Sequence, residues 1–266
     1  MPSIHPTAIV EDGATLADDV EVGAFSYVGP DVVLKAGVRL MPRATVLGRT
    51  TLCEEVVAHP GTVLGGDAQI VGLAPEAVGA LIVGPRTVLG DNVTLHTGSR
   101  MGSGHGETRI GADCFMMANS HFGHDCVVGD KCVIANSAAV GGHCHLGDQV
   151  WVAGLTAVHQ FTRIGDHAFV GGGAILVADL PPYCSAIGNR AHLAGLNLIG
   201  LKRRGFSRPV INTIRHAYKA LFHSEGTFQE RLGRVEAEYA SSADVMFLTN
   251  FIRDGGHRPL CQPEAV

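Results

Sequence analysis

Histidine is frequent in this chain, and several histidines lie close together in the middle of the sequence. The chain has 266 residues and 14 histidines, among them His121, His124, His143 and His159. Histidine is the most common general base in enzymes because a neutral imidazole can take a proton from a hydroxyl near pH 7. A single histidine is more often structural. Four that meet on one face of a fold would indicate a functional site.

Two residues related to His124 suggest what such a site would do. Asp125 follows it directly and could orient the imidazole ring or raise its basicity. Gly142 lies 18 residues further along, and a residue without a side chain leaves its backbone N–H open to a reacting carbonyl. If 18 residues make one turn of the structure, a base and an oxyanion donor lie on adjacent rungs. Acyl transfer to a hydroxyl requires this arrangement.

The same histidines leave a zinc lyase open as an alternative. A catalytic zinc ion needs three protein ligands with water in the fourth position, and three histidines could supply them. The seven cysteines add no support for a metal or disulfide framework, because their number is odd and no CxxC pair occurs. Metal analysis of the purified protein separates the two hypotheses.

A six-residue repeat would position these residues. Stepping by six from Ile4 to Leu64 reaches a large aliphatic residue every time except at Ala58. The pattern resumes over 83–101 and 110–176. The fifth residue of the hexad is small or β-branched. The residue after the large apolar one is often glycine, which suits a turn that needs a positive φ or has no room for a Cβ atom.

This pattern resembles the hexapeptide-repeat proteins, which fold as a left-handed parallel β-helix. Three hexads make one triangular coil in that fold, so the 27 hexads predict about nine coils. The coils would stack at about 4.8 Å, the spacing of neighbouring strands. Residues 18 apart would then lie above one another. The repeat therefore predicts that His124 and Gly142 are neighbours and that the four histidines share one side.

The repeat also predicts the domain organisation. We expect a β-helix domain over residues 1–182, with excursion loops near 65–82 and 101–109, and a C-terminal helical domain over 183–266. Cysteines at the inward-facing fifth position should be small core residues. These are Cys114, Cys126, Cys132 and Cys144.

The end of the chain has the signals of helices. Ser207 and Pro209 open a segment that runs to about residue 223, and Thr227 with Glu230 forms a capping-box pattern. A last helix covers about 243–253, and we expect the tail after Gly255 to be loose.

Charge and composition exclude several classes of protein. The net charge of −5 and the lack of a long basic run argue against nucleic acid as a partner. The N-terminus lacks the pattern of a signal peptide, and no run reaches about 18 apolar residues. We therefore expect a cytoplasmic protein without a membrane span.

Longer motifs resemble one family, the UDP-N-acetylglucosamine O-acyltransferases that begin lipid A synthesis (LpxA). The motifs are HPTAIV at 5–10, NVTLHTGS at 92–99, HFGHDCVVGD at 121–130, LTAVHQF at 155–161, DLPPY at 179–183 and GLKRRGFSR at 200–208. They span nearly the whole chain. The last one is more specific than the hexads, which many transferases share.

The resemblance implies a homotrimer with active sites in clefts between subunits, an acyl donor on acyl carrier protein, a UDP-sugar acceptor, and neither cofactor nor metal. His124 would be the general base, Asp125 its neighbour and Gly142 the oxyanion donor. The positions carried over as substrate-binding are Gln69, His96, His121, His143, His159, Gln160, Gly172, Asn197, Arg203 and Arg204. The glycine at 172 matches the position that limits acyl length and leaves room for a long chain. The two arginines also suit an acidic carrier protein.

The chain departs from the family pattern where the acceptor is held. Ile70 and Gly72 replace an Asp and a Lys, Thr97 replaces an Arg, and Ile199 replaces an acid. Each charge-assisted contact contributes about 1.5–3 kcal/mol. We therefore expect acyl transfer to be kept and acceptor recognition to be weakened or altered. A paralogue with another nucleotide-sugar acceptor and a trimeric binding module without catalysis remain as alternatives.

Overall fold

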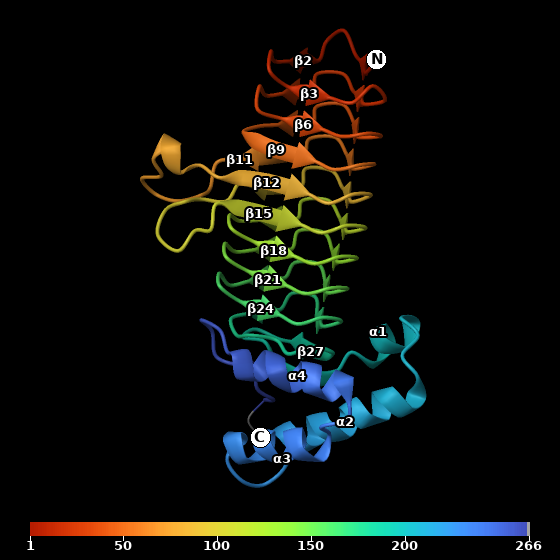
Figure 1. Cartoon of the computed structure of the whole chain (residues 1–266), viewed down its shortest axis with the longest axis vertical. Coiled ribbons are helices and arrows are strands. Elements are labelled where there is room, and N and C mark those ends of the chain that lie inside the picture. The colour runs from red at the N-terminus through yellow and green to blue at the C-terminus, as the bar shows by residue number, and fades with distance from the viewer. Residues whose placement is uncertain (265–266) are drawn as a thin grey trace.

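The computed structural model describes residues 1–264 and shows a left-handed parallel β-helix with a group of helices at its C-terminal end (Figure 1). Successive strands alternate among three sheets of 11, 9 and 8 strands. The first sheet contains β1 (Ser3–Ile4), β4 (Glu21–Val22), β7 (Arg39–Leu40), β10 (Val57–Ala58), β13 (Val88–Leu89), β16 (Phe115–Met116), β19 (Val133–Ile134), β22 (Trp151–Val152), β25 (Phe169–Val170), β27 (Cys184–Ile187) and β28 (His192–Leu196). The second contains β2 (Ile9–Val10), β5 (Tyr27–Val28), β8 (Thr45–Val46), β11 (Val63–Gly66), β14 (Thr94–His96), β17 (His121–Phe122), β20 (Ala139–Val140), β23 (Ala157–Val158) and β26 (Ile175–Leu176). The third contains β3 (Thr15–Leu16), β6 (Val33–Leu34), β9 (Arg49–Leu52), β12 (Ala80–Val83), β15 (Glu107–Ile110), β18 (Val127–Val128), β21 (His145–Leu146) and β24 (Arg163–Ile164).

The strands pair with the register that the repeat predicts. His121 lies opposite Ala139, which lies opposite Ala157, so each step of one coil is 18 residues. Each coil turns at corners where one residue has a left-handed backbone conformation. At the corner between the second and third sheets, this residue is Asp125, with φ of 58°, and His143, with φ of 59°, one coil further on. Aspartate and histidine tolerate this conformation better than β-branched residues do.

The glycines that follow the large apolar residues have a different role. In the regular coils most of them do not have positive φ. Instead, most lie against the next coil, as at Gly84, where a Cβ atom would lie 2.5 Å from the carbonyl carbon of Gly111. Lack of space therefore explains crowded positions such as Gly84, whereas Gly29 has room for a Cβ atom.

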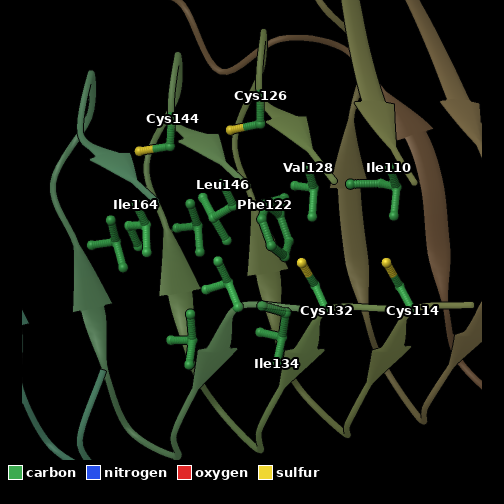
Figure 2. Packing of buried hydrophobic residues seen from close by; sticks show 14 of the residues in the cluster. Ile110, Cys114, Phe122, Cys126, Val128, Cys132, Ile134, Cys144, Leu146 and Ile164 are labelled. Carbon is green, nitrogen blue, oxygen red and sulfur yellow. The ribbon is translucent and has the colours of Figure 1, made fainter. Parts of the chain in front are cut away.

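The interior of the prism is a continuous apolar column. Figure 2 shows part of it, with the sulfur atoms of Cys114, Cys126, Cys132 and Cys144 pointing inward. All four cysteines are free and at most 1% exposed, as the repeat predicts. The thiol of Cys126 donates a hydrogen bond to the carbonyl of Gly141 at 3.1 Å. These cysteines are core residues.

Two segments leave the regular coils at the corner between the second and third sheets. Residues 67–79 connect β11 to β12 and include a short 3₁₀ helix, η1 (Pro75–Ala77), and residues 97–106 connect β14 to β15. Figure 1 shows both as loops that project from the same side of the stack. The two loops contact each other: the N–H of Arg100 in the second donates to the carbonyl of Ala77 in the first at 2.8 Å.

The C-terminal part is helical, with two exceptions. The helices are α1 (Leu198–Arg203), α2 (Arg208–Phe222), α3 (Phe228–Glu238) and α4 (Ala243–Asp254). Ser207 caps α2, and Thr227 with Glu230 forms the predicted capping box of α3. The expectation that everything beyond the repeat is helical was wrong for β27 and β28. β27 pairs with β25 and covers backbone groups that the last coil would otherwise leave unpaired, and β28 pairs antiparallel with β27.

The expectation of a loose tail after Gly255 was also wrong. Leu260 forms a β-bridge with Asp179, and Cys261 is 1% exposed. The tail therefore packs against the last coils. Within the described residues, no helix is both long and apolar enough to cross a membrane.

Candidate active site

The stacking of coils brings His124 and Gly142 into direct contact. They occupy the same position of two successive corners between the second and third sheets. A Cβ atom on Gly142 would lie 2.8 Å from Nε2 of His124 and about as close to the rest of the ring, so only glycine fits beneath it. The His124 side chain is 12% exposed, which leaves it reachable from outside. The neighbour relation predicted from the spacing is confirmed.

Asp125 holds the ring of His124 from the other side. Its Oδ2 lies 2.8 Å from Nδ1 of His124, and its side chain is fully buried. The carboxylate also accepts hydrogen bonds from three backbone N–H groups of the excursion loop 97–106. They belong to Ser99 at 3.1 Å, His105 at 3.0 Å and Gly106 at 3.2 Å. A carboxylate surrounded by donors stays ionised.

These contacts fix the tautomer of a neutral His124. Burial by itself would raise the pKa of Asp125, but the hydrogen bonds from His124 and from the N–H of Ser99 keep that pKa below its ordinary value of 3.8. An ionised carboxylate only accepts, so Nδ1 of His124 carries the hydrogen. In the neutral ring the lone pair of Nε2 is free, beside Gly142. This is the arrangement of a general base.

We expect the buried carboxylate to make stability depend on acidity. A group whose pKa is lower in the folded state stabilises the fold above its unfolded pKa, and that contribution is lost as the pH falls below about 3.8. The Asp125→Asn protein should therefore lose less stability than the wild type on acidification through this range. Urea midpoints measured as a function of pH test this. Asp91→Asn, which removes an exposed carboxyl outside the site, should follow the wild-type curve, and parallel curves for Asp125→Asn would contradict the expectation.

Further histidines line the same side of the stack. The His143 ring meets that of His124 edge-on at 4.8 Å and stacks on Phe161 at 4.4 Å. Nδ1 of His121 forms a hydrogen bond with the hydroxyl of Thr94 at 2.8 Å. The ring centroids of His121 and His96 lie 5.3 Å apart. Burial lowers the pKa of both His121 and His143, so both are neutral near pH 7. They can offer hydrogen bonds without adding charge.

Other predicted residues lie nearby. Nδ1 of His96 lies 2.8 Å from the carbonyl of Asp67, which ties this ring to the excursion loop that also contains the exposed Gln69. His159 and Gln160 lie at the next corner of the same column and are exposed. The predicted residues on and after strands of the second sheet therefore lie together on one side of the prism. We name the corner between the second and third sheets at this side the histidine corner (residues 121–126, 141–144 and 159–162).

The predicted residues of the α1 region lie elsewhere. Arg203 and Arg204 line a cavity of about 750 Å³ together with Trp151, Phe169 and Ile199. The strands at this cavity belong to the first sheet, which faces away from the corner between the other two sheets. Within a single chain, this cavity and the histidine corner therefore lie on different sides of the prism.

Two predicted residues of the α1 region, Asn197 and Arg204, also have structural roles. The side chain of Asn197 caps α1 by accepting from the N–H of Gly200 at 3.0 Å and donates to the carbonyl of His167 at 2.9 Å. Arg204 donates to the carbonyl of Gln149 at 2.5 Å. Arg203 is exposed and has no such contact among the described residues. Gly172 lies at an exposed corner with room for a Cβ atom.

Sequence reasoning missed the three residues that donate to Asp125. His105 and Gly106 belong to the stretch where the hexad pattern breaks, and Ser99 precedes it, because the loop begins at residue 97 and not near 101 as the repeat predicted. The break itself was the available signal, since it falls one coil before the predicted base and at the same corner. The residues that make the contacts could not be identified, because an irregular loop has no fixed register.

The zinc alternative has one group of side chains to consider. In the described chain, the possible ligand atoms of His124, Asp125 and His143 lie within 4.8 Å of one another. However, both oxygens of Asp125 already accept hydrogen bonds, and Nδ1 of His124 is one of the donors. A carboxylate used in this way orients the imidazole. The geometry therefore favours the general base over the metal ligand set.

An imidazole held by a carboxylate, next to a bare backbone amide on a β-helix of hexads, is typical of the class of hexapeptide-repeat acyltransferases. The family profile "bacterial transferase hexapeptide (six repeats)" matches residues 107–142, and the profile "UDP N-acetylglucosamine O-acyltransferase; domain 2" matches residues 179–261. The chain belongs to the UDP-N-acetylglucosamine O-acyltransferase family.

Individual relatives agree over the full length. The acyl-[acyl-carrier-protein]--UDP-N-acetylglucosamine O-acyltransferase of Caulobacter vibrioides is 53% identical over 262 residues, which cover 98% of both chains. The protein of the same name from Azorhizobium caulinodans is 52% identical and covers 98% of this chain and 95% of its own. The solved structure of LpxA from Acinetobacter baumannii superposes with a TM-score of 0.92 at 32% identity, over 97% of this chain and 99% of that one. The resemblance inferred from the motifs is confirmed.

Proposed function

We propose that this protein transfers a (3-hydroxy)acyl group from acyl carrier protein to a hydroxyl of UDP-N-acetylglucosamine. One observation carries the proposal: Nε2 of His124 faces Gly142, while Asp125 holds Nδ1. Family membership and the substrates in the names of the relatives support it. The donor also leads us to propose a cytoplasmic location, where acyl carrier protein works.

The proposed reaction uses these three residues in sequence. Nε2 of His124 takes the proton of the acceptor hydroxyl as its oxygen attacks the thioester carbonyl. The N–H of Gly142, which donates to no backbone carbonyl in the described chain, stabilises the negative charge on the tetrahedral oxygen. The intermediate then releases the carrier thiolate, which receives the proton from the imidazolium. Asp125 stabilises that imidazolium throughout.

We further propose that the working unit is a homotrimer with each site shared between two subunits. In a three-sided prism, the histidine corner points away from the first sheet, where Arg203 and the cavity lie. The two halves can meet only if a second copy supplies one of them. The position of the two surfaces supports a second copy. The number of three subunits and the role of Arg203 are taken from the family resemblance.

Subunit mixing tests the shared site. His124→Ala and Arg203→Glu should each lower activity strongly, and co-expression of the two should restore part of it. In randomly mixed trimers, about a quarter of the interfaces pair an intact His124 with an intact Arg203 of the neighbour, so activity should reach about a quarter of the wild-type value. Activity that stays at the level of the single variants would contradict a shared site. Mixing the separately folded trimers without exchange is the control.

The identity of the acceptor sugar can be measured directly. Ile199 is 67% exposed and lines the cavity, so an apolar side chain stands where the family has an acid. Thr97, in contrast, is fully buried and does not reach the surface. We propose that Ile199 weakens or alters recognition of the acceptor sugar. Mass spectrometry of the products from a panel of sugar nucleotides tests this, and normal activity on UDP-N-acetylglucosamine alone would contradict it.

A further inference from the structure

The tail that follows α4 is anchored against the last coils of the β-helix. The N–H of Asp179 donates to the carbonyl of Pro259, and the N–H of Cys261 donates to the carbonyl of Asp179, both at 2.8 Å. A Cβ atom on Gly256 would collide with the carboxylate of Asp179, so the tail passes this point in close contact. The backbone is therefore held on both sides of residues 257 and 258.

The anchored tail delivers two side chains to the histidine corner. The ring of His257 lies 5.2 Å from that of Phe161, which stacks on His143. Arg258 is half-buried and contacts His159 and Gln160, both predicted to bind substrate. Its Nε donates to the carbonyl of Gln160 at 2.9 Å, and one terminal nitrogen lies 2.7 Å from Nδ1 of His159. Neither residue of the tail is part of the repeat.

The contact with Arg258 determines which nitrogen of His159 carries hydrogen. A guanidinium group has only donors and does not lose its proton, so Nδ1 of His159 must accept. Nδ1 also lies 3.2 Å from the carbonyl of Gln160, which would require it to donate. The contact with Arg258 decides, because Nδ1 cannot carry a hydrogen while a guanidinium N–H points at it from 2.7 Å. Nδ1 of His159 is therefore the acceptor, and the ring hydrogen is on Nε2.

We propose that Arg258 is a positioning residue that makes His159 a fixed hydrogen-bond donor to the acceptor substrate. The inference rests on the proposed function, since it takes His159 as substrate-binding. Arg258 acts through the imidazole: it occupies Nδ1 and leaves the Nε2–H group available. A donor that contacts the bound acceptor in the ground state and the transition state alike affects KM more than kcat.

Steady-state kinetics of Arg258 variants test the proposal. Arg258→Met should raise KM for the acceptor about tenfold and change kcat less than about threefold. Arg258→Lys can keep one of the two hydrogen bonds and should give an intermediate KM. In a His159→Gln background, Arg258→Met should have no further effect, because the pathway through the imidazole is already gone. Arg253→Met is the matched control, since Arg253 pairs with Glu236 away from the site, and its kinetics should equal those of the wild type.

A spectroscopic readout separates this proposal from the activity itself. In ¹⁵N-histidine-labelled protein, Nδ1 of His159 should give the signal of an unprotonated nitrogen, and Arg258→Met should shift it. Wild-type KM in Arg258→Met, or an unchanged His159 signal, would overturn the proposal. So would a loss of kcat that accompanies a fall in Tm of more than about 5 °C, because this indicates a structural role. If the wild type transfers no acyl group, the proposed function fails, and the signal still decides the state of His159.

Discussion

Replacing Gly142 by alanine is expected to lower kcat by about 10²–10³-fold, the loss seen when one oxyanion donor is removed. The new Cβ atom would lie 2.8 Å from Nε2 of His124 and 3.0 Å from Cε1, so the ring must move away from the position beside the amide. The same methyl group would cover the N–H that is proposed to stabilise the tetrahedral oxygen. Both effects act on the transition state, so KM should change less than kcat. Single-turnover measurements with saturating acylated carrier protein check the size of the loss.

A matched control exists at the same corner, far from the site. Gly29 lies between the second and third sheets near the N-terminal end, and a Cβ atom there would meet its nearest neighbour, the carbonyl oxygen of Val46, at 3.5 Å. Gly29→Ala should therefore keep wild-type kcat. Wild-type kcat in Gly142→Ala, with Tm unchanged, would show that the amide is not the oxyanion donor. A crystal structure of the variant would show whether the imidazole has moved.

Removal of the base is the second large effect that we expect. His124→Ala should lower kcat by about 10²–10⁴-fold, the range for a general base, while binding of the acceptor stays close to that of the wild type. The reason is that Nε2 is the only nitrogen of the ring that is free to take a proton, since Nδ1 is held by Asp125. Kinetics for acyl transfer and calorimetry for acceptor binding measure the two quantities separately.

This variant also tests the alternative of a binding module without catalysis. Such a module would give the same results for His124→Ala and for the wild type in every assay. His216→Ala, which removes an exposed histidine on α2, is the control for nonspecific effects of losing an imidazole and should keep full activity. A loss of activity confined to His124→Ala would support the general base, and equal activity of all three proteins would contradict it.

The regular part of the site could be predicted from the sequence. A parallel coil of constant length places residues 18 apart in contact, so the spacing of His124 and Gly142 was sufficient to predict that they meet. The same period predicted that Cys126 and Cys144 point inward. Both results follow from backbone pairing, which repeats identically in every coil and does not depend on particular side chains.

Only the tertiary structure decided the contacts that come from outside the repeat. The donors to Asp125 lie in the loop 97–106, where the period breaks, and Arg258 reaches Gln160 across 98 positions of sequence. The separation of Arg203 from the histidine corner likewise depends on which sheet carries each strand. A loop and a tail have no period that fixes their path. Their positions result from packing and hydrogen bonds that form only when the whole chain has folded, and these contacts determine how His124 and His159 are held.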